Sequence, residues 1–475
     1  MTHTHTAHEA THHRPAAPPR RWLMLTVLCL AQFMLILDVT VVNVALPDMA
    51  ADLGLGRSTL TWAVTAYTLC FGGLMLLGGR LADVFGAPRT ALVGLALFTG
   101  ASLLTGLAQG AETLIAGRAA QGVGAALLSP AALSLVTTSF HGPERNKALG
   151  FWAAIGGSGS AIGVLLGGAL TDGPGWRWVF YINLPVGLLA LSALPALLPP
   201  RPRRPARLDL PGALLVTAAT AALIYGLVEA GDDGWASAGT LLSLLTAVVL
   251  YAAFTLVERA SREPLMDVRM LLRRPVAAGA FLMLVATALL IAFFFLGSVY
   301  LQGVREFSAL RTGLVFLPVA VGAAVGAHLG SRLVGTLGSR PTAAGGMGVA
   351  AAALLPLAWL DGQSPVYAVL MPALSVAALG VGAVFVTATA TALASVRHEE
   401  AGIASGVVNT FHEVGGSIGV AVMSTVAAAG IGGGVPEPFA DAFAVGAVAA
   451  AVAAAVSLLV VPRGRPQLTG GPHVH

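Results

Sequence analysis

Residues 22–46 read WLMLTVLCLAQFMLILDVTVVNVAL, an apolar run that contains one acid, Asp38. A mostly apolar run of about 20 residues can cross a bilayer as a helix, and this run is too long for the core of a signal peptide. A carboxylate inside such a helix costs roughly 2.5–3.5 kcal/mol on insertion scales and usually serves ion, proton or substrate movement. The run therefore predicts a membrane-spanning helix with a functional acid.

Composition extends this prediction to the whole chain. Of the 475 residues, 56% are hydrophobic and 10% are charged, whereas soluble proteins average about 25% charged residues. We therefore expect an all-α membrane protein and not an enzyme. The net charge of +4 does not indicate nucleic-acid binding. Cys29 and Cys70 both lie in apolar segments, so they predict neither a disulfide nor a metal framework.

Fourteen apolar segments are predicted to span the membrane. They are residues 22–46, 60–79, 90–110, 113–138, 148–171, 178–198, 210–229, 236–257, 276–300, 312–334, 342–360, 365–394, 402–430 and 439–461. Of the 26 Lys and Arg residues, 21 lie before the first segment, after the last or in alternate connections. The positive-inside rule assigns these regions to the cytoplasm, so we expect both termini on the cytoplasmic side of the plasma membrane.

An internal repeat divides the chain. Residues 78–90 read GGRLADVFGAPRT and residues 330–342 read GSRLVGTLGSRPT, with five of thirteen positions identical. Duplicated helix bundles are typical of secondary transporters, and eight predicted spans separate the two copies instead of six. The sequence therefore predicts two six-helix halves with two additional helices between them.

The predicted domains follow from the repeat and the linkers. They are a disordered His-rich cytoplasmic tail (1–21), an N-terminal six-helix bundle (22–198), a basic cytoplasmic linker (199–208), two additional helices (209–258), a cytoplasmic linker (259–275), a C-terminal six-helix bundle (276–461) and a cytoplasmic tail (462–475). The five histidines of the first tail leave metal binding as an alternative there, but no metal site is predicted in the chain.

Five motifs in order give the chain a resemblance that covers nearly all of it. They are LDVTVVNVALPDM (37–49), GGRLADVFG (78–86), LIAGRAAQGVGAA (114–126), GSAIGVLLGG (159–168) and WRWVFYINLPVG (176–187). With these motifs the chain resembles the major facilitator superfamily, and within it the fourteen-helix drug–proton antiporters. Two departures stand out: Ala87 and Pro88 precede Arg89 in the loop motif, and Val164 follows Gly163 where the antiporter motif has Pro.

Asp38 and Arg118 are predicted to form a pair. At 1.5 Å per residue, Asp38 lies roughly 12 Å and Arg118 roughly 8–9 Å below the same membrane surface. An unpaired charge at such depth is costly, so pairing is expected. The functional interpretation is a proton-sensitive switch in which protonation of Asp38 releases Arg118. A static structural pair is the alternative.

Glu413 is the second candidate for proton coupling. It lies near the middle of span 402–430, and burial there suits an acid that exchanges a proton for a cationic substrate. A permanently protonated, hydrogen-bonded acid is the alternative. His412 points about 100° away on a helix, so we do not expect it to be the partner of Glu413.

The remaining candidate residues have conformational or binding roles. By resemblance, a conformational latch lies in the first repeat, at Gly79, Asp83, Gly86 and Arg89. Small residues allow close packing of membrane helices, which is the role expected of Gly159, Gly163, Gly167, Gly168, Gly415 and Gly416. Polar and aromatic side chains within spans either line a substrate cavity or pack between helices, and those predicted to line it are Asn43, Trp62, Tyr67, Gln121, Phe294, Asn409 and Phe411.

These features predict a secondary active transporter that exports hydrophobic, often cationic, drugs or antibiotics in exchange for protons by alternating access. The expected partners are a lipophilic small molecule, protons and the bilayer, with the chain a monomer. No nucleotide-binding or catalytic motif is present, so we expect no cofactor and a proton gradient as the energy source. The alternatives are an exporter of one endogenous amphiphilic metabolite, peptide or lipid, and a membrane sensor that does not transport.

Overall fold

The computed structural model describes residues 18–140, 144, 148, 151–152, 162–163, 165–198, 209–261, 269–394, 396, 401–428, 430 and 435–464. Its elements are all helices within these ranges. The first group comprises α1 (Pro18–Leu53), α2 (Arg57–Phe85), α3 (Ala87–Gly106), α4 (Ala111–Ser139), α6 (Trp178–Tyr181) and α7 (Asn183–Leu197). Next come α8 (Leu210–Asp233), α9 (Ala238–Ala260) and α10 (Arg269–Leu272). The last group comprises α11 (Arg274–Val299), η1 (Tyr300–Val304), α12 (Ala309–Thr336), α13 (Ser339–Leu354), η2 (Leu355–Trp359), η3 (Val366–Leu370), α14 (Met371–Leu393), α15 (Ala401–Val426) and α17 (Glu437–Val460).

The helices have the length and composition of membrane spans. Ten of those described are long and apolar enough to cross a bilayer, and shorter apolar stretches, 62–75 and 211–227, lie within α2 and α8. Each predicted span coincides with a described helix except 148–171, half of which lies outside the described residues. The chain is therefore an all-α membrane protein.

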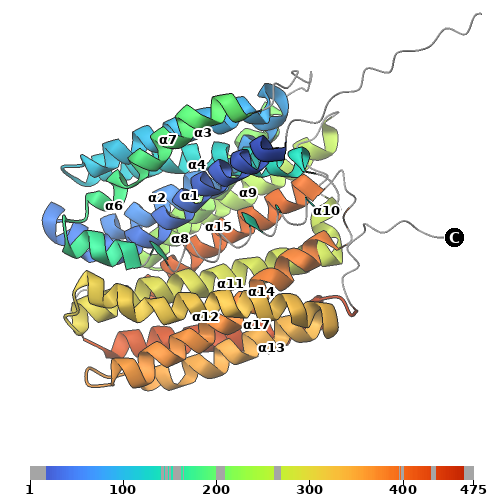
Figure 1. Ribbon diagram of the computed structural model, residues 1–475. Helices are drawn as coiled ribbons and strands as arrows, with labels where there is room; N and C mark the ends of the chain where they lie inside the picture. The colour runs from blue at the N-terminus through green and yellow to red at the C-terminus, as the bar shows by residue number, and fades with distance from the viewer. Residues whose placement is uncertain are drawn as a thin grey trace, which may run out of the picture.

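The long helices run side by side in one bundle (Figure 1). α3 and α7 lie at one side of it, α12, α13 and α17 at the other, and α8, α9 and α15 between them. α1 begins and α17 ends at the same end of the bundle, which we call the terminal face. The other end, which holds the loop after α1, is the opposite face.

The internal repeat is visible in the backbone. Gly86 and Gly338, which occupy equal places in the two copies, have φ angles of 93° and 92°. Positive φ favours glycine, and each glycine directly precedes the first residue of a helix, α3 or α13. Four residues later, Thr90 and Thr342 each donate a hydrogen bond to the carbonyl of their glycine. The two copies therefore make the same turn.

The first helix is longer than its apolar run. We predicted a span that ends at residue 46, but α1 continues through Pro47 to Leu53 and stops at Gly54, whose φ is +61°. Proline within a helix removes the hydrogen bond to the carbonyl four residues earlier, here that of Asn43. This carbonyl instead accepts a hydrogen bond from Ser298 of α11, at 3.0 Å. The Asn43 carbonyl left free by Pro47 thus forms a polar contact between α1 and the last group of helices.

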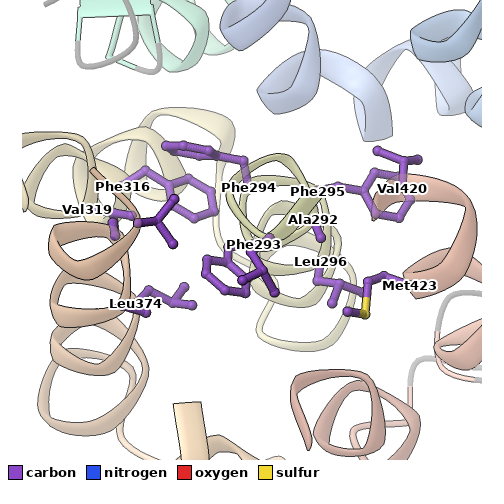
Figure 2. Close-up of a cluster of buried hydrophobic side chains, with 14 of the residues drawn as sticks. Ala292, Phe293, Phe294, Phe295, Leu296, Phe316, Val319, Leu374, Val420 and Met423 are labelled. Atoms are coloured by element: carbon purple, nitrogen blue, oxygen red, sulfur yellow. The ribbon is translucent and has the colours of Figure 1, made fainter. Parts of the chain in front are cut away.

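A large hydrophobic cluster joins the two groups toward the opposite face. It includes α1 residues from Leu37 to Met49 together with side chains of α11, α12 and α14. In Figure 2, the α11 residues Phe293–Leu296 lie between Phe316 and Val319 on one side and Val420 and Met423 on the other. A second cluster lies within the first group, and a third joins α8 and α9 to α11 and α15.

Asp172 adds a polar contact between the groups at this face. Its carboxylate oxygens accept hydrogen bonds from the backbone N–H of Ala309 and Leu310, at 3.0 and 2.9 Å. Both groups belong to the first turn of α12, where helix N–H groups have no intrahelical partner and a negative charge is stabilising. Gly168 packs nearby, since a Cβ there would lie 2.6 Å from the Ala309 carbonyl oxygen. The opposite face is therefore closed by packing and by hydrogen bonds.

Candidate transport site

Asp38 and Arg118 form a buried ion pair. The Nη1 atom of Arg118 on α4 lies 2.5 Å from Oδ2 of Asp38 on α1, and the side chains are 1% and 0% exposed. The Nε of Arg118 donates to the carbonyl of Ala63 on α2, at 2.9 Å. The predicted pairing is thus confirmed, and one guanidinium connects three helices.

Two amides complete the shell of the Asp38 carboxylate. Gln121 Nε2 and Asn183 Nδ2 each donate to Oδ1 of Asp38 at 2.9 Å. Both amides also donate to Ser102 Oγ on α3, at 2.9 and 3.3 Å. A buried carboxylate requires such partners, and here they come from α4 and α7, while Ser102 of α3 bonds the amides. We call Asp38, Ser102, Arg118, Gln121 and Asn183 the Asp38 network.

Burial makes this network a costly feature. Removing two charges from water costs several kcal/mol per ion even after relaxation, and an apolar replacement is often equally stable. Its members come from four helices of one group, so the arrangement of these helices determines whether the pair is satisfied. A change in the charge of Asp38 is therefore expected to act on the packing of the whole group.

Tyr67 of α2 covers the guanidinium. The Cζ of Arg118 lies 4.4 Å from the centre of the Tyr67 ring, a distance at which a cation is attracted to an aromatic face. The ring is fully buried, with an exposure of 0%. Tyr67 and Gln121, both predicted to line a cavity, thus belong to the immediate surroundings of the ion pair.

Glu413 lies where α15 meets α2. Glu413 is 9% exposed, and a Cβ added at Gly72 of α2 would lie 2.5 Å from the Cβ of Glu413. One turn further along α15, Ser417 and Thr68 share a hydrogen bond of 2.8 Å between hydroxyls. The second acid is therefore held at the contact between the first and last groups of helices, at a position that requires glycine on the facing helix.

The expectation about His412 is wrong. Its Nδ1 lies 3.1 Å from Oε1 of Glu413. Adjacent Cβ atoms diverge by about 100° on a helix, but both side chains are long enough to bend toward each other at the surface of α15. The His412 side chain is 39% exposed and that of Glu413 is 11% exposed. An ionisable group with access to solvent thus contacts the buried acid.

The other predicted cavity residues do not gather at one place. Trp62 lies in an open groove of about 400 Å³ formed with α8 and α9, where its ring centre is 5.8 Å from that of Tyr225. Phe294 is 4% exposed and packs against Phe316 in the core, contrary to the prediction that it lines a cavity (Figure 2). Phe411 packs partly buried against the third hydrophobic cluster.

The two asparagines of the cavity prediction have different surroundings. Asn43 is 3% exposed, and its Nδ2 donates to the carbonyl of Val39 in its own helix. Its Oδ1 has no hydrogen-bond partner among the described residues. Asn409 is half-buried on α15. Of the two, Asn43 alone carries a buried acceptor that a ligand or water can satisfy.

Several predicted latch and packing residues can be located. Gly86 makes the turn described above, Arg89 is exposed, and the side chain of Asp83 is outside the described structure. A Cβ added at Gly79 would make only ordinary van der Waals contact with Pro130, and a Cβ added at Gly416 would do the same with α11. A Cβ would overlap a neighbouring helix at three positions, Gly163 against α1, Gly168 against α12 and Gly415 against α11, and would be tightly packed against α1 at Gly167. Gly159 lies outside the described residues.

Sequence reasoning missed some of the polar groups at the site. Ser102 and Asn183 were not among the predicted site residues, although Asn183 donates to Asp38 and Ser102 accepts hydrogen bonds from both amides. Their signal in the sequence is a single polar residue in an apolar helix, which many packing residues share. Asp172 was missed as well, because its partners are backbone groups. Within the described residues, no cluster of three His, Cys, Asp or Glu side chains is arranged to hold a metal.

A buried ion pair shared among membrane-length helices, in a bundle built from a repeat, is typical of membrane transporters. The sequence model of the Major Facilitator Superfamily matches residues 28–420 of this chain. The chain belongs to this superfamily and is a multi-pass membrane transporter.

Several similar proteins are named for resistance to an antibiotic or for its export. The puromycin resistance protein pur8 of Streptomyces alboniger is 44% identical over 416 residues, which cover 86% of this chain and 82% of the relative. The cephamycin export protein CmcT of Amycolatopsis lactamdurans is 38% identical, covering 88% of each chain. The lincomycin resistance protein of Streptomyces lincolnensis is 37% identical, covering 90% of this chain and 88% of the relative.

Proposed function

We propose that this transporter exports hydrophobic, often cationic, drugs or antibiotics in exchange for protons. Relatives named for resistance to or export of puromycin, cephamycin and lincomycin support the substrate class. The observation that carries the proton coupling is the Asp38–Arg118 pair, buried and joined by two amides. Ionisable groups inside membrane helices usually serve ion or proton movement.

The exchange follows from the charge of the two acids. Protonation of Asp38 would neutralise the partner of Arg118 and weaken the bonds that unite α1, α4 and α7. Protonation of Glu413 would remove a negative charge that holds a cationic substrate. A proton and a cation therefore compete for the acids, and such competition is the basis of antiport. The proton gradient is the proposed energy source, with no cofactor.

Alternating access fits the contacts between the two groups of helices. The Asp172 and Ser298 hydrogen bonds and the large hydrophobic cluster close the opposite face. Rocking of one group against the other would break these contacts and open this face. By the positive-inside rule, the terminal face is cytoplasmic and the opposite face extracellular, so this arrangement closes the site to the exterior. We propose that the transporter acts as a monomer in the plasma membrane.

A narrower substrate range is the second candidate. The names of the three relatives each give a single antibiotic, which favours an exporter of one compound made by the host cell. Both candidates share the proton coupling and differ only in the number of substrates accepted.

The test uses purified protein in liposomes with an imposed pH gradient. Ethidium and puromycin serve as probes, and an uncoupler serves as the control. We expect uptake of at least one probe that requires the gradient and stops with the uncoupler. Transport of puromycin alone would support the narrow exporter. Equal movement of both probes with and without the gradient would contradict proton exchange.

Glu413→Gln is expected to reduce gradient-driven transport of cationic probes by about tenfold or more, because the amide keeps the size of the side chain but can neither ionise nor carry a proton. The measurement is the initial rate in liposomes at several pH values. Glu437→Gln is the matched control, since Glu437 lies in the first turn of α17 and belongs to neither acid site. Unchanged rates in Glu413→Gln at every pH would exclude Glu413 from coupling.

A further inference from the structure

Tyr67 has a buried polar group that the fold does not explain. The side chain is 0% exposed, and its hydroxyl has no hydrogen-bond partner among the described residues. A buried hydroxyl without a partner costs free energy that phenylalanine would avoid. Two other tyrosines satisfy theirs: the buried Tyr300 donates to the carbonyl of Asp361 at 2.9 Å, and the half-buried Tyr251 bonds Thr220 at the same distance.

Charged groups face Tyr67 from three helices. The Arg118 guanidinium of α4 lies over the ring, and Asp38 of α1 and Glu413 of α15 are both within electrostatic range. His412 contacts Glu413 and completes the set of titratable groups at this place. Tyr67 therefore lies in the field of both acids to which proton exchange is assigned.

The two acids belong to different groups of helices. The Asp38 network lies within the first group, whereas Glu413 is on α15, which touches the first group along α2. Tyr67 precedes Thr68, the residue that bonds Ser417 across this contact. Tyr67 is thus a polar side chain on α2, the helix that contacts both acid sites, and it interacts electrostatically with both acids.

We propose that the Tyr67 hydroxyl is a positioning group that couples the two acid sites, directly or through bound water. The hydroxyl is unpaired among the described residues in this arrangement; in another step of the transport cycle it donates to an ionised carboxylate and is released when that carboxylate is protonated. Protonation of Glu413 thereby changes the hydrogen bonding available to Asp38. This role rests on the proposed proton exchange, but the coupling itself can be measured without transport.

The experiment is a double-mutant cycle on purified protein, read by infrared titration of the carboxyl groups. The Asp38 band is identified by its loss in Asp38→Asn. Glu413→Gln is expected to shift the titration midpoint of Asp38 by about half a pH unit or more, and most of this shift should vanish in the Tyr67→Phe background. Interacting acids titrate as a pair, so dependence on Tyr67 measures the coupling. An equal shift in both backgrounds, or no shift in either, would overturn the proposal.

Tyr67→Phe keeps the ring that faces Arg118 and removes only the unpaired hydroxyl. Its Tm is therefore expected to equal or exceed that of the wild type, while the pH profile of transport moves to higher pH. Tyr300→Phe provides the opposite pattern: it loses a hydrogen bond, so its Tm should fall while its pH profile stays unchanged. Failure of the wild type to use a pH gradient would contradict the proposed function, whereas the infrared cycle would still decide the coupling.

Discussion

Asp38→Asn is expected to reduce gradient-driven export to the level of empty liposomes while substrate exchange without a gradient continues. Asparagine has nearly the shape of aspartate and its oxygen can still accept a hydrogen bond from Gln121 or Asn183. It cannot ionise, so the site no longer alternates between charged and neutral states. Loss of coupling with retained exchange is the result that separates a proton carrier from a structural acid.

This variant is expected to be less stable than the wild type, since Arg118 loses its counter-charge, but still to fold, because Arg118 retains other partners. The guanidinium still donates to the Ala63 carbonyl and to Gln121 Oε1, and still faces the Tyr67 ring. Asp209→Asn is the matched control, since Asp209 is also a buried acid but caps α8 through Gly212 N, and asparagine caps helices equally well. Full gradient-driven export in Asp38→Asn would show that Asp38 is not the coupling acid.

The Asp38–Arg118 pair could be predicted because its reasons are general. A charge within an apolar span is costly wherever it lies, and its depth follows from the rise of a helix. Two charges at similar depth within one predicted bundle are therefore expected to pair before any packing is known. The turn at Gly86 and its equivalent at Gly338 could also be predicted, because the two copies of the repeat have glycine at the same position.

The surroundings of the pair depend on packing that the sequence does not specify. Ser102 and Asn183 belong to the network only because α3 turns this face toward α4 and α7, and α7 turns this face toward α1. Phe294 belongs to an aromatic run in which core, lipid-facing and cavity positions have the same composition, and it packs in the core. His412 contacts Glu413 by side-chain bending, which helix periodicity alone does not include.

Arg118→Met is expected to have the largest effect on stability. It leaves the carboxylate of Asp38 buried at 0% exposure with only neutral donors. Removing one partner of a buried pair typically costs about 3–5 kcal/mol, whereas replacing both partners by neutral groups costs little. The single variant should therefore show a clear fall in Tm and in yield of folded protein.

The double variant Asp38→Asn/Arg118→Met is expected to regain most of the Tm but none of the gradient-driven transport. Thermal unfolding of the purified protein in detergent measures the first, and liposome uptake the second. Arg177→Met serves as control, because Arg177 pairs with Asp52 at an exposed position and exposed pairs contribute little. If the double variant were as unstable as Arg118→Met, the result would show that the guanidinium stabilises the bundle through Ala63 and Tyr67. The main role of the pair would then be structural. Recovery of folding without transport would instead show that the buried charges are retained for coupling.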